Sequence, residues 1–470
     1  MDRARHPADE ASGGERAALA AKLAAARAVG ALSRLAGRGA TSLPGKALVR
    51  MDPRAIGRLG ARLPHGSAVL SATNGKTTTA AMVASILERR GERLVHNRAG
   101  ANMAGGVATA LLRGGGDRGL FEVDEFWLDR VVPQLRPSAL LLANLFRDQL
   151  DRYGELEAIA DRWAAVVAGL DPAAALVLDA DDPLVADLGR ERPGVVYFGV
   201  DDPAMAMARM QHASDSKHCR RCGAPYVYDA IYLGHLGHYH CPTGDAERPQ
   251  PSVVASAVEL RGTRGAAFDL LVGGQRRRVE LPLPGLYNVY NALAAAALAH
   301  ALGASADEVV AGLRAVSPAF GRAETVTLAG TGAAAPRELS ILLVKNPAGA
   351  NEVLRTLVLE PGDHDLLGVL NDNVADGRDV SWIWDADFEV LAGRIRRATC
   401  AGTRAEELAV RLKYAGVAPE RIAVAPDVER ALDAAAADGD GRLYALPTYT
   451  AMLALRELLA RRGAARGSFR

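Results

Sequence analysis

Cysteine is scarce in this chain of 470 residues, and three of its four cysteines lie close together at Cys219, Cys222 and Cys241. So few cysteines exclude a fold held together by disulfides, and their clustering is typical of a metal site in a reducing compartment. An excess of one charge is also missing, because 56 Lys and Arg residues balance 55 Asp and Glu residues to a net charge of +1. No global field therefore attracts nucleic acid or an anionic membrane, and an anionic ligand must be bound by a local site.

Long hydrophobic runs are absent as well. The apolar stretch SALLLANLF lies between Arg136 and Arg147, well short of the roughly 20 apolar residues that span a membrane. Residues 1–14 are small and polar and include acidic side chains, which is unlike a secretory signal. We therefore expect a cytoplasmic protein without a transmembrane segment.

The remaining composition is that of an ordinary globular protein. Hydrophobic residues make up 49% and charged residues 24% of the chain, and its length suggests two or three domains. From Ser67 onward, short apolar runs alternate with segments of helical spacing, as in SAVLSA before TTTAAMVASILERR. This alternation predicts an α/β fold in which helices cover both faces of a parallel-rich sheet.

Changes in this rhythm divide the chain into three parts. Residues 1–48 are predicted to form a tail and a helix, over 15–37, that packs on the body. Residues 49–317 form a central domain, interrupted at 205–250 by a small module rich in Cys, His, Tyr and Gly. Residues 318–470 form a second, smaller α/β domain with strand-like runs such as ELSILLVK and HDLLGVLN.

A phosphate-binding loop is predicted between a strand and a helix, at the segment ATNGKTT over 72–78. Backbone N–H groups around Gly75 and at the helix N-terminus can bind phosphate oxygens. Lys76 would reach the β- and γ-phosphates of ATP, and the Thr77 hydroxyl would bind Mg²⁺. The expected nucleotide site consists of Thr73, Asn74, Gly75, Lys76, Thr77 and Thr78.

The loop TNGKTTT resembles the ATP loop of the Mur ligase superfamily, where Gly usually stands in place of Ala72. Three further segments resemble the same superfamily in the same order: NLFRDQLD at 144–151, DADDP at 179–183 and YNVYN at 287–291. Gln149 and Tyr287 stand where many members have His. The resemblance implies that Asn291 belongs to the nucleotide site and that Glu122, at the end of a strand beside the loop, could hold a second Mg²⁺.

One branch of this superfamily, the MurT-type subunits of lipid II isoglutaminyl synthase, is similar to nearly the whole chain from about Leu43. The similar segments lie at 96–107, 143–155, 217–241, 343–354, 370–389 and 401–413. The resemblance implies a Mur-ligase-type central P-loop domain with a parallel-rich sheet and an inserted zinc-ribbon-like module. A smaller Rossmann-like α/β domain would follow at the C-terminus.

The same resemblance implies an ATP-dependent amidation at the inner face of the cell membrane. The α-carboxylate of D-isoglutamate in the lipid II stem peptide would be phosphorylated, with Lys76 and Glu122 in the catalytic site, and ammonia from a GatD-type glutaminase would displace the phosphate. Asp379 matches an aspartate that is thought to complete the partner's Cys–His pair. Two alternatives stay open: a stand-alone amino-acid or folylpolyglutamate-like ligase, and a non-catalytic ATP-binding subunit.

The cysteine module has the spacing of a zinc ribbon, in which two loops each offer two thiolates. A fourth cysteine is missing after Cys241, and four histidines could replace it, namely His218, His235, His238 and His240. The alternative is a ribbon that folds on its aromatic residues without metal. Nucleic-acid binding by this module is not favoured, because its few basic residues have acids close by.

Overall fold

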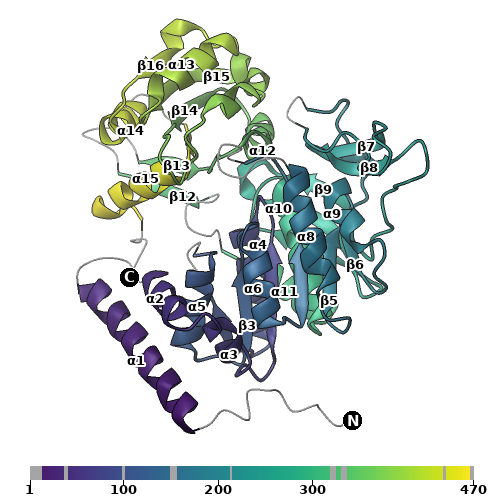
Figure 1. The fold of residues 1–470 in the computed structure, drawn as a ribbon. Coiled ribbons are helices and arrows are strands. Elements are labelled where there is room, and N and C mark those ends of the chain that lie inside the picture. Colours follow the sequence, from purple (N-terminus) through teal and green to yellow (C-terminus); the bar gives the residue numbers. More distant parts are fainter. Residues whose placement is uncertain are drawn as a thin grey trace.

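The computed structural model describes residues 13–35, 41–97, 101–148, 156–211, 214–317, 324–329, 336–437 and 441–465. This part of the chain forms two helix-covered sheets and a separate β-hairpin (Figure 1). The predictions for residues 1–12 and 149–151 lie outside the described ranges.

The larger sheet has nine strands in the order β11-β10-β9-β6-β5-β4-β1-β3-β2 within the described residues. Its strands are β1 (Ser67–Ser71), β2 (Leu94–His96), β3 (Arg118–Glu122), β4 (Ala139–Leu142), β5 (Ala175–Asp179), β6 (Val196–Val200), β9 (Val253–Leu260), β10 (Ala266–Val272) and β11 (Gln275–Leu281). All neighbouring pairs from β2 to β9 are parallel, whereas β9, β10 and β11 pair antiparallel. The predicted parallel-rich sheet is therefore confirmed, with an antiparallel extension at one edge.

Helices cover both faces of this sheet, so its central strands are apolar on both sides. In β1, Ala68 and Leu70 pack into one buried cluster, and Val69 packs into the other. One face is covered by α4 (Lys76–Arg89), α10 (Leu286–Ala301) and α11 (Ala306–Arg314). The other face is covered by α2 (Leu43–Met51), α3 (Ala55–Gly60), α5 (Ala104–Arg113), α6 (Leu128–Leu135) and α8 (Leu156–Ala168), with the short α9 (Pro183–Ala186) at its end.

The second sheet lies in the C-terminal part of the chain, shown in green and yellow in Figure 1, and has the order β12-β13-β17-β14-β15-β16. Its strands are β12 (Glu324–Leu328), β13 (Arg337–Ile341), β14 (His364–Val369), β15 (Ile395–Ala401), β16 (Ile422–Val424) and β17 (Leu443–Pro447). The associated helices are α12 (Pro347–Val358), α13 (Ala405–Tyr414), α14 (Val428–Ala437) and α15 (Tyr449–Arg461). Only the β12–β13 pair of this sheet is antiparallel among the described strands.

Two smaller elements complete the described fold. The predicted N-terminal helix is present as α1 (Gly13–Leu35), and Leu19, Leu23 and Ala26 are buried where it packs against the central domain. The inserted module forms a hairpin of β7 (Val227–Leu233) and β8 (Leu236–His240). No helix in the described ranges is long and apolar enough to cross a membrane.

Candidate functional site

The phosphate loop occupies the carboxyl end of β1, between its parallel neighbours β3 and β4. Gly75 has a φ of +84°, and a Cβ at this position would lie 1.9 Å from Oδ1 of Asn291. Only glycine fits a left-handed position with so little space. Helix α4 begins directly after it at Lys76. The N–H groups of that first turn have no acceptors within the helix and are available to an anion.

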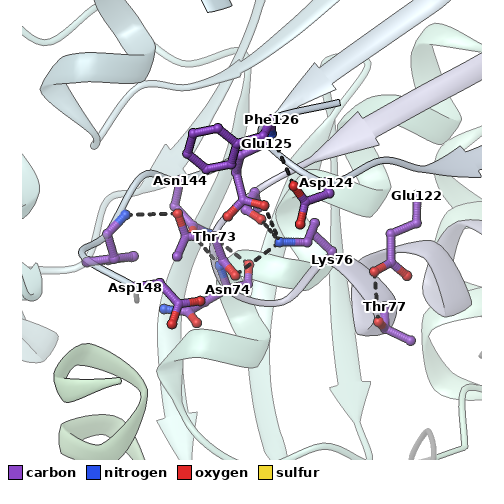
Figure 2. Close-up of polar contacts among 12 residues, drawn as sticks. Thr73, Asn74, Lys76, Thr77, Glu122, Asp124, Glu125, Phe126, Asn144 and Asp148 are labelled. Atoms are coloured by element: carbon purple, nitrogen blue, oxygen red, sulfur yellow. Dashed lines mark hydrogen bonds and ion pairs between the residues drawn. The ribbon is translucent and has the colours of Figure 1, made fainter. Parts of the chain in front are cut away.

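Lys76 lies buried beneath the loop and forms an ion pair with Glu125, with Nζ 2.8 Å from Oε2 (Figure 2). Its ammonium group also donates to the carbonyl oxygens of Ala72 and Thr73. Burial alone would lower the pKa of Lys76, but the charges of Glu125 and Asp124 outweigh burial and raise it. The ammonium group therefore stays charged.

Glu125 is an acidic residue of the site that the sequence motifs do not indicate. Burial alone would raise its pKa, whereas the charges of Lys76 and Lys345 lower it, and the net pKa lies below the usual range. The neighbouring Asp124 behaves differently, because burial and the Glu125 charge raise its pKa. The segment after β3 thus places two carboxyl groups close to Lys76, and their pKa values are shifted in opposite directions.

Thr77 and Glu122 meet on the other side of the loop, where the threonine hydroxyl donates to Oε1 of Glu122 at 3.1 Å (Figure 2). Glu122 is the last residue of β3, and Asn97 fixes its backbone through hydrogen bonds of 3.0 and 2.7 Å. A hydroxyl and a carboxylate at contact distance are hard oxygen ligands of the kind that Mg²⁺ prefers. These two residues therefore fit the expected magnesium ion.

The other predicted loop residues line the same cavity, and Thr73 also has a structural role. Its backbone N–H donates to the carbonyl of Asn144 at 2.9 Å, and its hydroxyl accepts the N–H of Phe146 at 3.1 Å. Asn291 accepts the Thr79 hydroxyl at 3.3 Å and so supports the first turn of α4. Thr78 is buried and also faces the cavity.

The C-terminal domain contributes two polar residues that sequence reasoning did not assign to the site. The side-chain amides of Asn346 and Asn74 hydrogen-bond to each other at 3.0 and 3.4 Å. Lys345 donates to the Thr73 carbonyl at 3.1 Å and to Oδ2 of Asp148 at 2.5 Å. The segment LVKNPAGANEVL could have indicated these two residues, because it lies between a strand and the start of helix α12.

A cavity of about 340 Å³ joins these groups between the two domains. Lys76 and Lys345 are the basic residues among the described lining residues, and the acids are Glu122, Asp124, Glu125, Asp148 and Glu352. The apolar lining residues include Leu233, Leu236, Leu283, Leu342, Leu343 and Val353. A polyphosphate beside five carboxyl groups requires additional positive charge, which agrees with magnesium at Thr77 and Glu122.

Asp379 is not part of this cavity. It is exposed, and its Oδ1 accepts the backbone N–H of Ser381 at 2.8 Å. Interactions with the Ser381 side chain and backbone lower the pKa of the Asp379 carboxyl. Other aspartates nearby serve the fold: Asp372 pairs with Arg404 at 2.8 Å, and Asp376 accepts the N–H of Thr450 at 2.7 Å. Asp379 is thus presented to the outside of the C-terminal domain.

The three clustered cysteines come together in the inserted module, with all three sulfur atoms within 4.8 Å of one another. Three thiols at this spacing suit a soft, tetrahedral ion such as Zn²⁺. None of the four histidines that could supply a fourth ligand belongs to this cluster among the described residues. The pleat and pairing of the hairpin direct these side chains elsewhere: His235 packs on Phe146, His238 bonds the Val200 carbonyl, and His240 faces Asp229.

This chain is similar to known proteins both in sequence, by family models and relatives, and in fold, by solved structures. A family model for the Mur ligase middle domain matches residues 71–239, and one for the MurT ligase C-terminal matches residues 343–452. Among solved structures, the pseudomurein peptide ligase type C from Methanothermus fervidus aligns with a TM-score of 0.66 and 24% identity, covering 86% of this chain and 80% of that one. The folylpolyglutamate synthase of Mycobacterium tuberculosis aligns with a TM-score of 0.59 and 19% identity, covering 90% and 99%.

The fold and the phosphate loop therefore define a Mur ligase, an ATP-dependent ligase class. The MurT subunit of lipid II isoglutaminyl synthase from Streptococcus pneumoniae is 34% identical over 438 residues, which is 92% of this chain and 94% of that protein. The corresponding Staphylococcus aureus N315 protein is 33% identical over 433 residues, or 91% and 95%. The chain belongs to this MurT family, as the sequence resemblance indicates.

Proposed function

We propose that this chain is the ligase subunit that amidates the α-carboxylate of D-isoglutamate in the lipid II stem peptide. The nitrogen would come from a GatD-type glutaminase, and the products would be D-isoglutamine, ADP and phosphate. The observation that carries the proposal is similarity over nearly the full length to proteins named as MurT subunits of lipid II isoglutaminyl synthase. Lys76 and Thr77 of the phosphate loop, together with Glu122, support catalysis rather than a scaffold role.

The chemistry explains why ATP is required. A carboxylate is a poor electrophile, because attack by ammonia would have to expel an oxide ion. Transfer of the γ-phosphoryl group to the carboxylate makes an acyl phosphate, and ammonia can then displace phosphate with formation of the C–N bond. Charge develops on the transferred phosphoryl group, so fixed cations beside it accelerate the step.

Lys76 and Lys345 are the side chains of the cavity that can supply this charge. Lys76 is held by Glu125 and Lys345 is held by Asp148, so both ammonium groups are fixed close to the phosphate loop. Thr77 and Glu122 would hold Mg²⁺, which when bound neutralises phosphate charge. The two domains thus each contribute one lysine to a single phosphate site.

The location between two domains also protects the intermediate. An acyl phosphate hydrolyses if water reaches it, and free ammonia is scarce at neutral pH, so sheltered transfer from a docked glutaminase addresses both problems. Asp379 would act outside this cavity, across the interface with the glutaminase. There its carboxylate would orient a histidine of the partner and stabilise the imidazolium ion.

Mass spectrometry of a lipid II reaction tests the proposal. The reaction contains this chain, its glutaminase partner, ATP, Mg²⁺ and glutamine, and each component is omitted in turn. Conversion of one carboxyl group to a carboxamide that depends on both proteins is the expected result. ATP hydrolysis coupled to addition of an amino acid would support a stand-alone ligase instead, and no ATP use under any condition would support a scaffold.

The active-site assignment needs its own variants. Lys76→Ala should abolish amidation, since the phosphate loop loses its charge. Lys46→Ala is a matched control, because Lys46 is an exposed lysine on α2, which packs on the same sheet, and it does not line the cavity. Equal activity of the two variants would contradict the assignment of the site.

A further inference from the structure

The near-neutral net charge of the chain conceals an uneven distribution of charge. From the first residue of α1 to the residue before β1, residues 13–66 contain ten Lys and Arg residues but only two acidic residues. Because the whole chain carries a net charge of +1, the remainder of it is net negative. The positive charge is therefore concentrated on α1, α2 and α3, of which α1 and α2 lie side by side at one side of the molecule (Figure 1).

Much of this positive charge is not neutralised within the fold. Lys22 and Arg58 share the buried Asp52, with nitrogen–oxygen distances of 3.7 and 2.9 Å. Other arginines of the region are exposed and form no ion pair within the described part of the chain, namely Arg34, Arg50, Arg54 and Arg62. Their guanidinium groups thus give this side of the molecule a local positive potential that attracts polyanions.

Large apolar side chains are exposed among these arginines. Leu32 and Leu35, in the last turn of α1, are 66% and 85% exposed. Leu43 and Met51, the first and last residues of α2, are also exposed, as is Met103 directly before α5. A single exposed leucine is ordinary, but exposed leucines beside unpaired cations are typical of a surface that enters the headgroup region of an anionic bilayer.

Close helix contacts bring this surface next to the nucleotide cavity. A Cβ on Gly30 of α1 would lie 3.0 Å from Cγ of Pro44, so the end of α1 packs on the start of α2. A Cβ on Gly45 would lie 1.9 Å from the carbonyl oxygen of Gly105, so the start of α2 packs on the start of α5. Met103, two residues before Gly105, lines the nucleotide cavity. The exposed residues at the α1–α2 junction therefore adjoin the entrance to the site.

From this arrangement we propose that an N-terminal surface docks on an anionic lipid bilayer, and that it consists of Leu32, Arg34, Leu35, Leu43, Arg50 and Arg54. The arginines would lie among the phosphate headgroups, and the leucines would enter the boundary of the acyl chains. A nucleic acid would pair with the arginines but would leave the leucines in water, so a bilayer is favoured. Docking would hold the cavity at a lipid surface, where a lipid-linked substrate is found.

Co-sedimentation of the full-length chain with vesicles tests the proposal, without ATP, glutaminase or lipid II. We expect binding to vesicles of phosphatidylglycerol and phosphatidylcholine in equal parts, and much weaker binding to phosphatidylcholine alone. Each Lys or Arg at an anionic surface strengthens binding by about fivefold, so Arg34→Gln/Arg50→Gln/Arg54→Gln should weaken it by about 100-fold.

A matched control separates the location of the charge from its amount. Arg89→Gln/Arg314→Gln/Arg430→Gln removes the same charge from exposed positions on α4, α11 and α14. Because these arginines lie outside the N-terminal surface, the control should bind vesicles like the wild-type chain. Circular dichroism of each variant establishes that its helices are folded.

The leucines distinguish a bilayer from another polyanion. Leu32→Ser/Leu35→Ser keeps every charge, and it should weaken vesicle binding by at least about tenfold if both side chains enter the bilayer. An unchanged affinity would overturn the proposal in favour of a polyanion, such as a nucleic acid, that contacts the arginines alone.

Two further results would overturn the proposal. One is a triple variant of the N-terminal surface that binds anionic vesicles as tightly as its matched control. The other is a wild-type chain that fails to bind anionic vesicles but binds neutral vesicles containing lipid II, which would assign the arginines to the substrate itself. None of these measurements requires amidation, so a failure of the proposed function would leave them unaffected.

Discussion

Replacing Lys76 by Met should destabilise the nucleotide-free chain in addition to abolishing turnover. Lys76 and Glu125 form a buried ion pair whose side chains are 10% and 9% exposed, with 2.8 Å between the charged atoms. Removal of one partner from a buried pair costs about 3–5 kcal/mol, because the other charge is left without compensation. Lys345 also stabilises the Glu125 carboxylate, so we expect the lower end of that range, about 3 kcal/mol.

The loss of stability should depend on pH. In the wild-type chain burial opposes the two lysines, but the folded pKa of Glu125 still lies below its unfolded value. Glu125 therefore contributes stability above the unfolded pKa of about 4.3, and this contribution is lost as the pH falls through the folded pKa. In Lys76→Met, burial dominates and raises the folded pKa of Glu125, so the destabilisation should be larger at pH 8 than at pH 5.

Urea unfolding followed by tryptophan fluorescence measures both effects. Trp163 is a suitable reporter, because it is fully buried and its indole N–H donates to the Glu125 carbonyl at 3.2 Å. The double variant Lys76→Met/Glu125→Gln should recover most of the lost stability, and Lys46→Met should unfold like the wild-type chain. A destabilisation that is equal at pH 5 and pH 8, or a double variant as unstable as the single one, would refute the reasoning.

Three further predictions concern activity. Lys345→Ala should lower the ammonia-driven amidation rate by about 10²–10³, as loss of one preorganised cationic contact does, and an unchanged rate would exclude the second lysine from the site. Gly75→Ala should remove the thermal stabilisation by Mg·ATP, because its Cβ would lie 1.9 Å from Asn291 Oδ1, and undiminished stabilisation would argue against phosphate at this loop. Asp379→Asn should reduce glutamine-driven amidation in the complex up to about 10⁴-fold while sparing the ammonia-driven reaction, and equal losses would contradict a role across the interface.

Much of the fold follows from local sequence patterns. The apolar run before TNGKTTT becomes β1, the loop turns at Gly75, and α4 begins at Lys76, because each step depends on residues close together in the chain. β9 was not predicted as a strand. Ala257 has a φ of +47° at an irregularity of the β9–β10 pairing, and such a break disturbs the alternation by which strands are recognised.

A different reason explains why some residues of the site could not be predicted from the sequence. Lys345 and Asn346 reach the phosphate loop from a second domain, 272 positions from Thr73 and Asn74, and no local pattern encodes such a contact. Glu125 sits three residues after the expected Glu122, but its role depends on which way the chain turns after β3. The choice among the four histidines stayed open for the same reason, since spacing alone does not say which way a hairpin side chain points.

The β7–β8 hairpin connects the cavity between the two domains with the cysteine cluster. Its turn supplies Leu233 and Leu236 to the wall of the nucleotide cavity, and the end of β8 runs directly into Cys241. Leu236 and Cys241 are five positions apart along β8, a span of about 16 Å of extended chain. The cysteine cluster and this wall of the cavity therefore belong to one short hairpin, and residues at its two ends serve two different parts of the molecule.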